Sequence, residues 1–108
     1  MTCSELDAAL RELADNVYKD AAPPGVYEYV VWAVSGYRTV LGDDGVQMRI
    51  PKVQIDLYSQ ADTADIEGGF FDTLLEGLDE LGLVYSVQDV GFDHDAAAMR
   101  CIIQLEAV

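Results

Sequence analysis

The sequence has 108 residues, of which 51% are hydrophobic, and a formal net charge of −14 from 20 acidic and 6 basic residues. Length and hydrophobic content predict one folded domain, residues 1–108, with an ordinary core. The acidity excludes the basic face that duplex-binding and anionic-membrane-binding proteins need, and favours a surface that repels DNA or attracts a basic protein.

A first helix is predicted over residues 4–19. Ser4 is a good N-cap, and the apolar residues that follow recur at helical spacing along one stripe. These are Leu6, Leu10, Leu13 and Val17. Pro23 and Pro24 end the helix and hold the next segment extended.

Residues 26–34 (VYEYVVWAV) are rich in β-branched and aromatic side chains, which predicts a strand. A Gly-Asp-Asp-Gly turn at 42–45 then separates two extended stretches, which predicts a hairpin arm over residues 37–50 joined to a core strand over 53–58. The apolar alternation changes parity at Pro51, so a bulge or bend is predicted there.

A second helix is predicted to begin at Asp62 or Asp65 and to end at Gly82. Its apolar arc is Phe70, Phe71, Leu74, Leu75, Leu78 and Leu81. A strand over 83–89, a turn over 91–95 and a closing strand over 97–108 follow, the last with Met99, Cys101, Ile103 and Leu105 facing inward.

The resulting order is α-β-β-α-β-β. It predicts an α+β fold in which two helices cover one face of a four-stranded, mainly antiparallel sheet, with a projecting β-hairpin arm.

Reactive residue types are present, but their spacing does not indicate catalysis. His94 lies between Asp93 and Asp95 and is interpreted as part of a solvated turn, because a metal site would need further ligands. Asp43 and Asp44 are explained by turn formation, and Asp56 by a solvent-facing position on a strand. The sequence has no phosphate-binding loop and no Gly-x-Ser-x-Gly motif, so no enzymatic activity, cofactor or metal is expected.

Cysteine usage and hydropathy indicate where the chain is made. Cys101 is expected to be a buried thiol within a strand, and Cys3 lies at the terminus; a disulfide between them is the alternative to free thiols in a reducing compartment. No signal peptide opens the sequence and no apolar run approaches the ~20 residues of a membrane span, so synthesis in the cytoplasm is expected.

The arm carries more apolar surface than two short helices can cover. Either it folds back on its own domain, or it is a subunit interface. The candidate interface residues are Tyr37, Arg38, Val40, Leu41, Val46, Met48 and Ile50.

The order of these elements resembles the tail terminator (tail-completion) proteins of long-tailed bacteriophages and prophages. The resemblance lies in the first helix, the Pro23-Pro24 entry into the aromatic strand at 27–32, and the Gly/Asp loop. It continues through Val-Gln-Ile-Asp-Leu-Tyr-Ser at 53–59, the acidic helix ending Leu-Asp-Glu-Leu-Gly-Leu at 78–83, and two terminal strands. It covers nearly the whole chain, but no single motif is diagnostic.

This resemblance implies a structural virion protein that caps the tail tube, stops its polymerisation and joins the tail to the head connector. The implied partners are other copies of the chain, commonly in a six-fold ring, the tail-tube protein, and the head–tail connector or stopper protein. DNA would pass through the ring without specific binding, and some such proteins stay monomeric until they meet the tube. The implied location is the tail or neck of the virion, with candidate residues 37–50 facing a neighbouring subunit or the tube.

Two other functions remain open. The chain is similar in size to other phage neck or head-completion components. Its charge also suits an acidic regulatory or inhibitor domain that mimics DNA and binds a basic protein.

Overall fold

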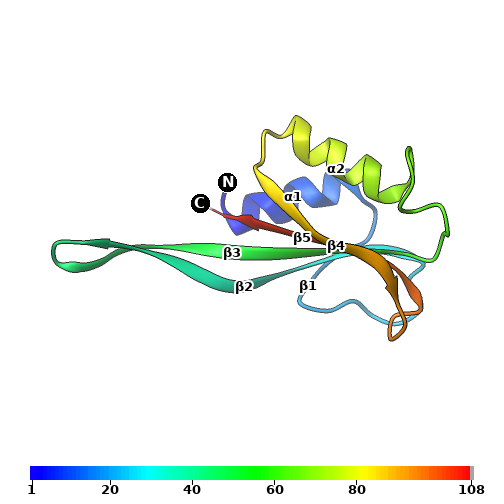
Figure 1. Cartoon of the computed structure of the whole chain (residues 1–108), viewed down its shortest axis with the longest axis horizontal. Coiled ribbons are helices and arrows are strands. Elements are labelled where there is room, and N and C mark those ends of the chain that lie inside the picture. Colours follow the sequence, from blue (N-terminus) through cyan, green and yellow to red (C-terminus); the bar gives the residue numbers. More distant parts are fainter. Residues whose placement is uncertain (108) are drawn as a thin grey trace.

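Two helices lie on the same side of a five-stranded mixed sheet in the computed structural model, which describes residues 1–107 (Figure 1). The elements are α1 (Cys3–Leu13), β1 (Val17–Lys19), β2 (Glu28–Gly42), β3 (Gly45–Ser59), α2 (Phe70–Glu80), β4 (Tyr85–Asp93) and β5 (Ala98–Glu106). The strand order is β1-β2-β3-β5-β4, with β1 parallel to β2 and all other pairs antiparallel. The predicted α+β class is confirmed, but the sheet has one strand more than predicted.

The additional strand, β1, comes from residues that had been assigned to the first helix. That helix ends at Leu13 rather than at residue 19, and its N-cap is Thr2, whose side chain forms a capping box with Glu5. Val17 is buried, as the helical spacing suggested. It lies in a strand rather than a helix, however, and pairs with Val30 of β2. Strand pairing prevails here because β-branched and aromatic residues at 17 and 18 favour an extended backbone.

Strands β2 and β3 form one long hairpin whose distal part projects from the body (Figure 1). The bulge expected at Pro51 is wrong. The extra residue is Ser35 on the opposite strand, because Val34 pairs with Val53 and Gly36 with Lys52. β3 therefore alternates without interruption from Met48 through Pro51, and its own extra residue is Gln47, nearer the tip of the hairpin.

The overall dimensions reflect this projection. The chain measures 51 × 29 × 22 Å and has a radius of gyration of 14.9 Å, whereas a compact domain of this length is expected near ~13 Å. It exposes 6461 Å², against roughly 5,900 Å² expected for its mass. The alternative in which the arm folds back on its own domain does not match this shape.

The second helix begins later than predicted. Its N-cap is Gly69, not Asp62 or Asp65, and residues 62–69 form a series of turns. Glycine is required at this position, because a Cβ there would lie 2.3 Å from the carbonyl oxygen of Thr63 and 2.8 Å from that of Ala64. The helix starts only where the backbone has left this crowded turn.

The last two strands also shift along the chain. The predicted turn at 91–95 is in fact at 94–97, because the Asp93 carboxylate accepts hydrogen bonds from the backbone N–H groups of Asp95 and Ala96 at 2.9 and 3.2 Å. β4 therefore continues through Gly91 to Asp93. Val108, the last residue of the predicted closing strand, lies outside the described residues.

The core fills the space between the helices and the sheet. Its largest fully buried side chains come from α1, α2 and the three central strands: Leu6, Leu10, Val30, Val53, Ile55, Leu57, Leu74, Leu78, Cys101 and Ile103. Cys101 is a free thiol, as is Cys3, and burial raises the pKa of Cys101 to about 11. A buried thiol with so high a pKa is a poor nucleophile.

Candidate assembly surfaces

The arm, defined as residues 37–50, presents apolar side chains that no other part of the described chain covers. Val40 pairs directly with Met48, and Leu41 pairs with Val46. Directly opposed residues in an antiparallel pair point to the same side, so each pair forms a small apolar contact surface. All four side chains are exposed, Leu41 to 71%.

The other candidate residues of the arm have different surroundings. Tyr37 is 60% exposed. Arg38 Nε donates to both carboxylate oxygens of Glu106 at 3.0 Å, which ties the base of the arm to β5. Ile50 is only 8% exposed in the single chain and so contributes little free surface.

Basic residues are concentrated in the arm and at its base. Residues 37–52 hold three basic residues, Arg38, Arg49 and Lys52, against Asp43 and Asp44, a net charge of +1. The total net charge is −14, so the remaining residues together carry a net charge of −15. Arg49 and Lys52 form no ion pair within residues 1–107.

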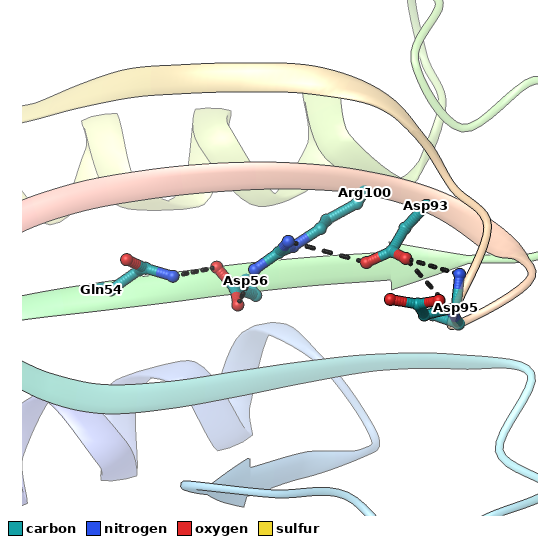
Figure 2. A network of polar contacts seen from close by, with 6 residues as sticks. Gln54, Asp56, Asp93, Asp95 and Arg100 are labelled. Carbon is teal, nitrogen blue, oxygen red and sulfur yellow. Dashed lines mark hydrogen bonds and ion pairs between the residues drawn. The ribbon is translucent and has the colours of Figure 1, made fainter.

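The sheet face opposite the helices, called the open face, has a polar network at its centre (Figure 2). Arg100 of β5 donates to Asp56 of β3 at 2.8 Å and lies 3.6 Å from Asp93 of β4. Gln54 donates to the other oxygen of Asp56 at 3.0 Å. Asp56 does lie opposite the core side chains of β3, as predicted, but its side chain is only 13% exposed because this network encloses it.

Two tyrosines extend the open face toward β2. The rings of Tyr29 and Tyr58 stack with centroids 4.8 Å apart, and the Arg100 guanidinium lies 5.6 Å from the Tyr58 centroid. Burial raises the pKa of both phenols, so the two tyrosines stay neutral at physiological pH. Because the guanidinium is neutralised by two carboxylates, this network serves packing better than it serves anion binding.

Strand β4 forms a second apolar surface, at the edge of the sheet. Val87, Val90 and Phe92 are each about half exposed, and Val84, just before the strand, is 91% exposed. The sequence predicted a strand in this region but no interaction surface on it. The alternation of Val87, Val90 and Phe92 is interrupted by a bulge at Gln88, which hid the pattern.

The turn between β4 and β5 bears the residues considered for metal binding. His94 is exposed, and its ring contacts Phe92 edge-on at 5.0 Å. An open recess of about 380 Å³ lies beside it, lined in part by Asp89, Asp93 and Asp95. Within residues 1–107, no group of three or more His, Cys, Asp or Glu residues is arranged to hold a metal ion.

In comparisons with known proteins, no family model and no curated protein matches the sequence. Among residues 1–107, no helix has the length and apolar character needed to cross a membrane.

Proposed function

We propose that this protein is a structural subunit that assembles with copies of itself into a ring, caps a phage tail tube, stops its polymerisation and joins the tail to the head connector. The observation that carries the proposal is the arm: four exposed apolar side chains at the end of a 51 Å molecule. Apolar patches of this kind on small proteins usually mark an interaction surface.

The resemblance described above supplies the identity of the assembly, and the charge distribution supports it. A ring of subunits with net charge −14 would not retain DNA in transit, which suits a conduit. Residues 37–52, the arm and its base, have a net charge of +1 and are the part of the chain best able to approach another acidic copy.

Light scattering on the concentrated protein, alone and with the tail-tube protein encoded by the same genome, tests this proposal. We expect a mass several times 11.8 kDa and ring-shaped particles in negative stain, or ring formation on the ends of tubes. Leu41→Asp and Met48→Asp should abolish assembly while leaving circular dichroism unchanged, because both side chains are exposed in the single chain. Tyr27→Asp, at an exposed site outside the arm, is the control.

A strict monomer at every concentration, even with tubes present, would refute the proposal. Tight binding to a basic nucleic-acid enzyme without any association with tubes would favour an acidic inhibitor instead. Assembly at a different position in the virion neck would favour another head-completion component.

A further inference from the structure

The outer edge of β4 is free. β4 is the last strand in the sheet, so the backbone groups along its outer side pair with no other strand of the described chain. Natural proteins usually shorten, cover or charge such an edge to prevent strand addition. This edge is nine residues long and carries an exposed apolar strip, defined as Val87, Val90 and Phe92.

The two sides of β4 differ in chemistry. The strip pairs across the ladder with core residues of β5, so it faces the helix side of the sheet. Asp89 pairs with Ile102 and therefore faces the open side. A strand added to this edge would continue both faces, so it needs apolar residues on one side and a basic residue on the other.

The β3 half of the arm carries an apolar and a basic residue on its two faces. Met48 lies opposite Val40 and Arg49 lies opposite Thr39, so their side chains point to opposite faces. Gln47 is an extra residue in β3, which places Val46, opposite Leu41, on the other face from Met48. Within residues 1–107, its outer edge pairs with no other strand, since the pairing of β3 with β5 begins only at Lys52. Arg49 has no ion-pair partner within residues 1–107.

We infer that the β3 edge of the arm of one copy adds to the outer edge of β4 of the next copy. Met48 then extends the apolar strip of the neighbour, and Arg49 lies beside its Asp89. The inference rests on the proposed self-assembly and specifies its interface. The contact joins two different surfaces, so it repeats from copy to copy and closes into a ring when the rotation between copies permits.

Charge disfavours the symmetric alternative. Asp89 is the middle residue of β4, which spans Tyr85–Asp93. Two β4 strands related by a two-fold axis through their centre would place one Asp89 against the other, and directly opposed like charges destabilise a strand pair. The free edge of β4 therefore suits the arm better than it suits a second β4.

Site-specific cross-linking distinguishes these arrangements. In a Cys3→Ser background, Met48→Cys and Val87→Cys are made in separate chains and treated with a short bis-maleimide; the remaining Cys101 is buried. We expect covalent dimers only when the two variants are mixed, and a ladder of higher oligomers when one chain carries both substitutions. Tyr27→Cys, which is similarly exposed, should not cross-link to Val87→Cys.

A charge exchange provides the second measurement. Asp89→Arg and Arg49→Asp should each lower the association constant more than tenfold, and the double variant should recover most of it. Glu12→Arg, an exposed site on α1, controls for the change in net charge. Both readouts use the full chain, with tubes added if assembly requires them.

The outcomes separate this inference from the proposed function. If Val87→Cys cross-links to itself, or if the charge exchange restores nothing while the wild type still assembles, the arm-to-β4 contact is wrong and ring assembly stands. If the wild type never assembles, both are wrong.

Discussion

The indole N–H of Trp32 donates a hydrogen bond of 2.8 Å to one carboxylate oxygen of Asp7. The other oxygen of Asp7 accepts from Arg11 Nε at 2.9 Å. This carboxylate thus joins α1 to β2 and satisfies a donor on a side chain that is only 5% exposed. A buried donor without a partner costs stability, so Asp7 has a structural role that its surface position would not suggest.

Replacing Asp7 by alanine should lower the free energy of unfolding by about 1–3 kcal/mol, because the Trp32 N–H loses its acceptor. Asp7→Asn should cost less, since an amide oxygen can still accept. Urea denaturation followed by fluorescence measures this directly, because Trp32 is the only tryptophan. Asp15→Ala, an exposed site just after the helix, is the control; an Asp7→Ala variant as stable as this control would contradict the prediction.

The same carboxylate should make stability depend on pH. The hydrogen bond from Arg11, and then that from Trp32, lower the pKa of Asp7 below its ordinary value. A carboxylate with a lowered folded-state pKa stabilises the protein fully above its unfolded pKa, near ~4, and this contribution is lost as the pH falls through the folded value. Stability should therefore decline below about pH 4, less steeply for Asp7→Asn than for the wild type. Parallel curves from pH 6 to 3 would show that Asp7 does not contribute.

The α+β class and the arm were predictable because each depends on local pattern. The Gly-Asp-Asp-Gly turn fixes the hairpin, with Asp43 and Asp44 as its turn residues and Gly45 at φ +105°. β1 was not predictable in this way. Val17 continues the helical spacing of Leu13, and only pairing with a strand thirteen residues further on makes it extended.

The candidate surfaces also differ in whether local sequence pattern is enough to predict them. The arm's apolar residues follow from composition and turn position. The apolar strip on β4 needs the strand order as well, because Val90 is exposed only when no further strand lies beyond it. The network on Asp56 likewise depends on Arg100, forty-four residues away, which no spacing in the sequence reveals.

Arg100 should contribute more to stability than an exposed ion pair does. Arg100→Met leaves the carboxylates of Asp56 and Asp93 without their shared cation in a half-buried site and removes the contact with Tyr58. We expect a loss of about 1–3 kcal/mol. Lys19→Met is the matched control, because the Lys19–Asp20 contact of 2.9 Å is nearly as short as the Arg100–Asp56 contact of 2.8 Å, but both of its side chains are more than half exposed. That variant should lose less than about 0.5 kcal/mol. Equal losses by urea denaturation would show that the network adds nothing beyond a surface pair.

Gly69 is the position at which an added methyl group should be least tolerated. A Cβ would lie 2.3 to 2.9 Å from three backbone carbonyl oxygens in the turns before α2, and backbone atoms cannot rotate away as side chains do. Gly69→Ala should therefore destabilise the protein by about 1–3 kcal/mol, although alanine normally favours a helix. Gly36→Ala is the matched control, because nothing lies within 4 Å of its Cβ position, and it should change stability by less than about 0.5 kcal/mol. Thermal or urea unfolding of the two variants checks the difference. If Gly69→Ala were as stable as Gly36→Ala, the turn over 62–69 would have to be looser than its close backbone contacts require.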